Sequence, residues 1–216
     1  RKELKQYRKA LEVISESRKI AEEIGDVVHQ AKSLRAIGEI LQKVGNHSDA
    51  LPHFRRSLTI MQEIGDTVGM SNVQYRIGRS LYVMGQYSEA SQYLERCDSL
   101  YLRIGLIPER IAPLRIISTI AWMNNNPEAA FQGLREIEHI GEEFGQTHDI
   151  ALALLLKVLL LELLNRPEEL LPVARRGREL TLQFGDSLLA AEVEAIIGRA
   201  DLKLGLYDDA LRNFQS

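Results

Sequence analysis

The sequence predicts an all-α protein made of stacked helical hairpins, and three sets of residues support this prediction. The first set consists of glycines that stand 40 residues apart: Gly25, Gly65, Gly105, Gly145 and Gly185. The second set lies midway between them and runs in phase: Gly45, Gly85, Asn125, Asn165 and Gly205. The third set is small or apolar and has the same period: Ala10, Ala50, Ala90, Ala130, Leu170 and Ala210. A fixed period along the whole chain is typical of repeat proteins, in which each unit buries its apolar face against its neighbours.

Residues 26–65 show how one repeat is built. Asp26 can accept hydrogen bonds from the free N–H groups of a first helix, and Gly45 can adopt the left-handed conformation that ends this helix. Asn46 or Ser48 then caps a second helix, which ends at Gly65. Along each helix, apolar residues recur at helical spacing on one face: Leu34, Ile37 and Leu41 in the first helix, and Ala50, Phe54, Met61 and Ile64 in the second.

The same 40-residue period organises the chain into one predicted domain, residues 1–216. It comprises a second helix (7–24), four full repeats (26–65, 66–105, 106–145 and 146–185) and a partial repeat (186–216). No linker rich in Pro, Gly or Ser interrupts the period. Residue 216 falls inside the second helix of a hairpin, so we expect that the native chain is longer.

Composition excludes several classes of function. The chain has 27 Lys and Arg against 30 Asp and Glu, with a net charge of -3, which disfavours non-specific binding to nucleic acid. A single cysteine, Cys97, cannot form an internal disulfide and fits a reducing, cytoplasmic setting. The leucine-rich segment 151–164 contains Lys157 and Glu162 and is shorter than the roughly 20 apolar residues of a membrane span.

Three segments resemble the tetratricopeptide repeat family: Ala36–Phe54, Arg76–Leu94 and Ile196–Phe214. Each has an apolar–Gly pair, a Gly between the helices, a small residue in the second helix and an apolar residue four positions later. The usual period of this family is about 34, so a period of 40 indicates helices that are longer by nearly one turn. The resemblance implies a right-handed superhelical solenoid whose first helices line a concave wall.

Matching the family pattern residue by residue predicts which side chains contact a partner in this concave groove. Aromatic and arginine side chains are frequent anchors of interfaces, and several of the matched positions carry them. The candidates are Arg35, Tyr75, Arg79, Tyr82, Arg115, Trp122, Leu152, Leu155, Leu159 and Arg199. The alternative is that these are ordinary solvated or packing residues; Arg35, for example, can pair with Glu39 four residues later on the same helix.

The sequence shows no grouping of residues that is typical of catalysis. The five histidines are not spaced as metal ligands, and the glycines end helices rather than form a phosphate-binding loop. Glu138, His139, Glu142 and Glu143 lie close enough on one helix for a weak cation site, but a solvated acidic face explains them better. We therefore predict no enzymatic activity, no cofactor and no metal.

Two functions fit this sequence. The first is a protein-interaction scaffold that binds a peptide or helical segment of a partner in the concave groove. The second is a sensor or regulatory module of a larger signalling protein, such as a transcription regulator, kinase or cyclase, that binds a small effector or dimerises. The leucine-rich helix 151–164 would provide the surface for a homodimer, because an open apolar patch of this kind is usually covered.

Overall fold

The computed structural model describes residues 2–183, Gly185 and residues 187–215. Residues 1 and 216, the limits of the predicted domain, and residue 186, where the predicted partial repeat begins, lie outside the described residues. The chain divides into two compact units, Arg1–Ile117 and Ser118–Ser216, and each unit is described by itself.

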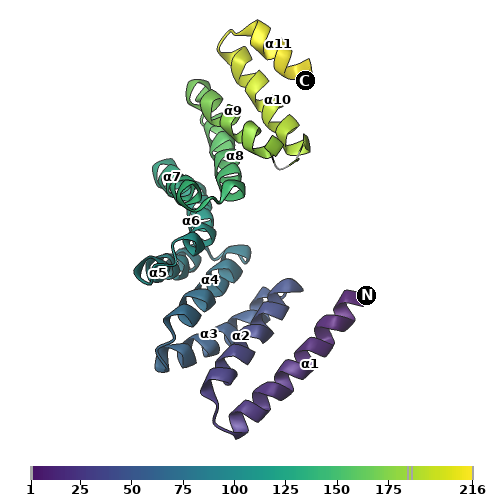
Figure 1. Ribbon diagram of the computed structural model, residues 1–216, viewed down its shortest axis with the longest axis vertical. Coiled ribbons are helices and arrows are strands. Elements are labelled where there is room, and N and C mark those ends of the chain that lie inside the picture. Colours follow the sequence, from purple (N-terminus) through teal and green to yellow (C-terminus); the bar gives the residue numbers. More distant parts are fainter. Residues whose placement is uncertain (1, 184, 186, 216) are drawn as a thin grey trace. The chain divides into compact units, whose positions relative to one another are not determined.

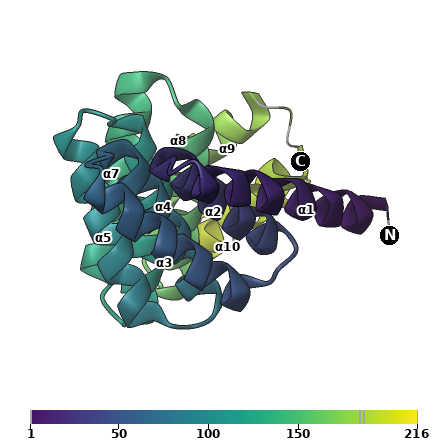
Figure 2. The ribbon, with the colours of Figure 1, turned by 90° about the horizontal axis from the view of Figure 1, so that it is seen from below.

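The first unit is a series of helices, the first five of which pack against one another in sequence order (Figures 1 and 2). Its elements are α1 (Lys2–Glu23), α2 (Val27–Lys43), α3 (His47–Glu63), α4 (Thr67–Val83), α5 (Tyr87–Arg103), a 3-10 turn η1 (Pro108–Arg110) and the first part of α6 (Ile111–Met123). Helices α2 and α3 form one hairpin, and α4 and α5 form the next.

The second unit contains the end of α6 and five further helices, again packed in sequence order. They are α7 (Pro127–Phe144), α8 (Thr147–Leu163), α9 (Pro167–Gln183), α10 (Ser187–Lys203) and α11 (Tyr207–Gln215). The core of this unit centres on Val158, Leu161, Leu170, Val193 and Ile197, which are all buried. The part of the chain that the structure describes contains helices and turns and no strand, so the all-α prediction is confirmed.

The helices end at the Gly and Asn positions that the 40-residue period predicts. Gly45 and Gly85 have φ of 81° and 77°, a conformation that glycine adopts without steric cost. Asn125 and Asn165 replace glycine at the same positions and also adopt left-handed φ, 58° and 54°. After α2, the Gly45 N–H donates to the Gln42 carbonyl at 3.0 Å. Each helix end thus satisfies its last carbonyls through a tight turn, which returns the chain antiparallel.

Two glycines on the first helices of the first two hairpins, Gly38 and Gly78, allow the two helices of each hairpin to pack closely. A Cβ on Gly38 would lie 2.6 Å from the Phe54 ring, and a Cβ on Gly78 would lie 2.6 Å from Leu94. A side chain at either position would force Phe54 or Leu94 to shift, so glycine lets the second helix approach the first at this distance. The predicted caps are also present, since Asp26 accepts a hydrogen bond from the His29 N–H at 3.0 Å.

The start of the third repeat differs from the regular pattern. The turn η1 precedes α6, and the buried Arg110 side chain extends from this turn toward α5. Its Nε donates to Asp98 Oδ1 at 2.9 Å and its second guanidinium nitrogen lies 3.3 Å from Oδ2, a two-point contact that fixes the turn against α5. The third repeat therefore begins with a 3-10 turn that an ion pair holds against α5.

Candidate functional site

The ten candidate contact residues divide equally between the two units. Arg35 lies on α2, Tyr75, Arg79 and Tyr82 lie on α4, and Arg115 lies on the part of α6 that belongs to the first unit. Trp122 at the end of α6, the three leucines on α8 and Arg199 on α10 belong to the second unit. Each group is therefore considered separately.

Helices α2 and α4, the first helices of consecutive hairpins, lie side by side through polar contacts. Gln42 Nε2 donates to the backbone carbonyl of Arg76 at 2.9 Å and to the Ser80 hydroxyl at 2.8 Å. A half-buried amide that donates to two groups of the neighbouring helix fixes the spacing of the two helices. Side chains that project from both helices consequently share one surface.

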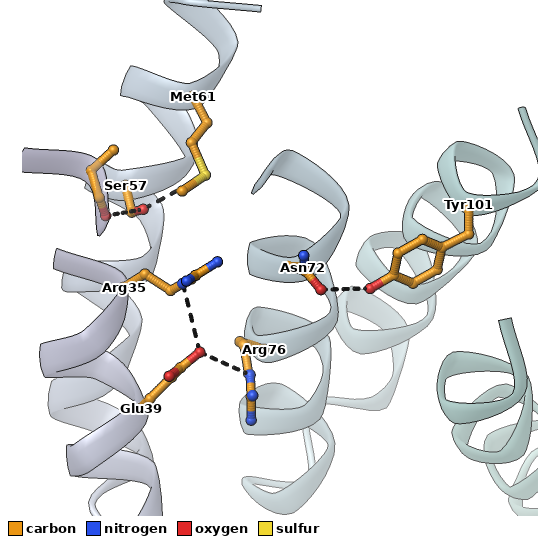
Figure 3. Close-up of polar contacts among 8 residues, drawn as sticks. Arg35, Glu39, Ser57, Met61, Asn72, Arg76 and Tyr101 are labelled. Atoms are coloured by element: carbon orange, nitrogen blue, oxygen red, sulfur yellow. Dashed lines mark hydrogen bonds and ion pairs between the residues drawn. The ribbon is translucent and has the colours of Figure 1, made fainter. Parts of the chain in front are cut away.

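The centre of this surface is a carboxylate shared by two arginines (Figure 3). Glu39 Oε1 lies 3.7 Å from Arg35 Nε on its own helix and 3.4 Å from Arg76 Nε on α4. The predicted contact between Arg35 and Glu39 is thus present, but it is one half of a bridge between helices. Arg76 is not among the predicted contact residues, because it lies beside the matched family positions rather than at one of them.

The rest of this surface is positively charged and aromatic. Arg79 is exposed and has no ion-pair partner among the residues that the structure describes. Burial lowers the pKa of His47, and the positive charge of Arg79 contributes to this shift. The Tyr82 ring packs against Tyr87 with 5.8 Å between ring centroids. We call this surface the α2–α4 face and define it by Arg35, Glu39, Gln42, Tyr75, Arg76, Arg79 and Tyr82.

In the second unit the candidate residues are more engaged with the fold. Arg199 Nε donates to Glu162 Oε1 on α8 at 2.8 Å, so the positive charge of Arg199 is already compensated. Leu155 is half-buried and packs against the core, whereas Leu159 is 48% exposed. The surface of α8 therefore offers a partner Leu159 and its exposed neighbour Leu163 more readily than Leu155.

The acidic residues of α7 serve as structural partners for cations. Glu138 lies 3.0 Å from Lys157 Nζ on α8 and 3.6 Å from Arg176 on α9, which also contacts Glu142 at 2.5 Å. Among the described residues, no group of three or more His, Cys, Asp or Glu side chains is placed to hold a metal ion. Glu138 and Glu142 thus link three helices, while His139 and Glu143 are exposed.

Cys97 lies in the core of the first unit and is fully buried. Burial raises the pKa of its thiol to about 12, well above the ordinary value of 9.0. Because the thiolate is the nucleophilic form, a thiol with this pKa remains protonated and unreactive at neutral pH. Its surroundings are those of a packing residue.

These features define a helical-hairpin repeat protein, and comparison with known proteins shows which family model its first part matches. The family model described as tetratricopeptide repeat matches residues 1–63 and 29–103. The first 103 residues of the chain thus match the tetratricopeptide repeat model, and the helices of the second unit continue the same hairpin pattern. A comparison with curated proteins finds no match.

Solved structures with the same fold span nearly the whole chain. BtubC (BKLC) from P. vanneervenii has a TM-score of 0.79 at 12% identity, over 97% of this chain and 88% of that one. A signal transduction ATPase with a tetratricopeptide repeat sensor, from Pyrococcus horikoshii, has a TM-score of 0.82 at 16% identity, over 99% of this chain and 34% of that one. A Rap protein complexed with competence and sporulation factor has a TM-score of 0.67 at 16% identity, over 98% and 58%.

Membrane insertion of a helix is not indicated. Within the described residues, no helix combines the length and the apolar character that crossing a membrane requires.

Proposed function

We propose that this chain is a protein-interaction scaffold whose α2–α4 face binds an acidic peptide segment of a partner protein. The observation that carries the proposal is the charge of this face: it has three arginines, two of which share its one carboxylate, on a chain whose net charge is -3. Arginine recognises carboxylates through two parallel hydrogen bonds, and its planar group loses little freedom on binding.

The tyrosines supply the second part of the proposal. Tyr75 and Tyr82 are both half-buried, so each ring is held in place by the fold while part of it remains accessible. A rigid aromatic ring contributes contact area at low entropic cost, which suits an anchor for a short peptide. A peptide that alternates acidic and apolar residues would use both kinds of side chain.

The experiment that tests this proposal uses two charge changes of opposite sign. Arg79→Glu should weaken partner binding at least about tenfold, because it replaces an uncompensated cation with an anion that repels the peptide. Glu39→Gln should strengthen binding, because it removes the only carboxylate of the face and releases Arg35 and Arg76. Affinity capture with the whole chain as bait, followed by titration of the captured partner, measures both changes.

Arg56→Glu is the matched control, since Arg56 is an exposed arginine on α3 outside the α2–α4 face. All three variants alter exposed or half-exposed charges, so their melting temperatures should stay close to that of the wild type. Equal affinity of the Arg79→Glu and Arg56→Glu variants for the captured partner would contradict the proposal.

A regulatory module within a larger signalling protein is the second candidate. The observation that favours it is that the chain matches only 34% of the ATPase from P. horikoshii, whose repeats are described as a sensor. The Rap protein, of which the chain covers 58%, was crystallised with competence and sporulation factor bound. A chain of this kind would pass the binding of an effector to an attached output domain.

A further inference from the structure

A second possible binding site lies between α4 and α5, and none of its lining residues belongs to the α2–α4 face. It is an open cavity of about 620 Å³, which is within the range of small-molecule sites. Its lining includes Met70 and Gln74 on α4, and Arg96, Ser99, Leu100 and Arg103 on α5.

Gln74 is the informative residue of this cavity. Its side chain is buried, with 6% of its surface exposed, and its Oε1 has no hydrogen-bond partner among the described residues. A buried amide oxygen without a donor destabilises a folded protein, so an unpartnered one calls for an explanation.

Comparison with the other repeats shows that the fold does not require a polar residue at this position. The residues 40 positions before, 40 after and 80 after Gln74 are the buried leucines Leu34, Leu114 and Leu154, at 4%, 8% and 1% exposure. In the last repeat the position carries Glu194, which is satisfied by Arg178 at 2.6 Å. Gln74 is thus a polar substitution for leucine that lacks the partner Glu194 has.

The cations of the cavity are also uncompensated. Arg96 and Arg103 are exposed and make no ion pair within the part of the chain that the structure describes. They lie seven residues apart, about 10 Å along one face of α5, with Ser99 between them. Met70 and Leu100 provide the apolar part of the lining. The cavity therefore offers an amide, a hydroxyl and two cations beside an apolar surface, and its one lining carboxylate, Glu95, leaves an excess of positive charge.

We propose that this cavity binds an N-acylated amino acid group, in which an amide adjoins a free carboxylate. The carboxamide of Gln74 offers both a donor and an acceptor, and its terminal torsion turns easily, so it can form paired hydrogen bonds with the ligand's amide. Arg96 and Arg103 bind the carboxylate, and an apolar side chain of the ligand contacts Met70 and Leu100. Such a group occurs at the C-terminus of a peptide and in a free acylated amino acid.

The test is a calorimetric titration of the whole chain with N-acetyl-L-leucine and, in parallel, with N-acetyl-L-leucinamide, which lacks the carboxylate. The acid should bind saturably, and the amide at least about tenfold more weakly, because it cannot pair with the arginines. Gln74→Leu and Arg96→Gln should each weaken binding of the acid by at least about tenfold. Arg56→Gln, 40 residues before Arg96, is the matched control and should bind like the wild type.

Gln74→Leu should at the same time raise the melting temperature by about 2–4 °C, because leucine removes the unpartnered amide. The Arg79→Glu variant of the α2–α4 face should bind N-acetyl-L-leucine normally, which separates this site from the proposed function. Saturable binding of a tetrapeptide that ends in leucine would identify a peptide terminus as the source of the ligand, and binding of N-acetyl-L-leucine alone would identify a free acylated amino acid. Absence of saturable binding by the wild type, or equal binding by Gln74→Leu and wild type, would overturn the proposal.

Discussion

At the scale of single residues, a charged side chain with an ion-pair partner on another helix stabilises the fold, and one without such a partner can bind another molecule. Glu39, Arg199 and Glu138 all have partners on neighbouring helices, so their charges hold helices together. Arg79, by contrast, has no ion-pair partner among the described residues and lies on the surface. Charge that the fold does not use is available to a partner, and this distinguishes Arg79 on the α2–α4 face from Arg199 in the second unit.

Cys97 gives a prediction at this scale. Burial holds the pKa of its thiol at about 12, whereas the unfolded chain should ionise it near the ordinary value of 9.0. Because the folded state keeps its proton longer, the contribution of the buried thiol to stability is complete below pH 9 and is lost as the pH rises toward 12.

The free energy of unfolding, measured by urea titration from pH 8 to the alkaline limit of folding, should therefore fall more steeply in the wild type than in the Cys97→Ala variant. Alanine leaves the other alkaline groups in place, so the difference between the two slopes reports the thiol. Identical slopes would show that the thiol is as accessible in the folded state as in the unfolded chain.

At the scale of elements, helix ends were the most predictable feature and side-chain partners the least. The Gly and Asn residues of the 40-residue period specify where helices end, because few residues adopt positive φ. Asn125 and Asn165 adopt positive φ as the glycines do. The 3-10 turn η1 could not be predicted, because it depends on the contact of Arg110 with Asp98, twelve residues earlier on α5.

Helix α8 carries the prediction of self-association. Its apolar residues extend around the helix, and Leu159 and Leu163 are 48% and 71% exposed. If this surface joins two copies of the chain, light scattering of the isolated protein should show a dimer that Leu159→Glu dissociates.

The structure favours Leu159 over Leu155 as the residue to substitute in this test. Leu155 packs against the core of the second unit, so Leu155→Glu would disturb the fold as well as any interface. Leu182, exposed to 51% on α9, supplies the control Leu182→Glu. A wild-type monomer at high concentration would exclude the homodimer.

At the scale of the whole molecule, the sequence predicts the repeat architecture well and the contacts of the candidate sites only in part. The fold can be predicted because each hairpin repeats the same pattern of helix-ending residues and apolar spacing. The contacts between hairpins, such as that of Arg76 with Glu39, depend on the spacing of neighbouring helices and are not visible in the pattern of one repeat. Gln74 did carry a signal, namely its departure from the leucines at the equivalent positions.

A photo-crosslinking amino acid placed on the α2–α4 face would show whether a partner protein binds there. Inserted at Tyr82, it should form an adduct with a partner protein, and mass spectrometry should map the adduct to an acidic segment. Inserted at Gln62, an exposed residue of α3 outside this face, it should form no such adduct. Adducts of equal yield at both positions, or adducts at position 82 that map to basic segments, would contradict the account.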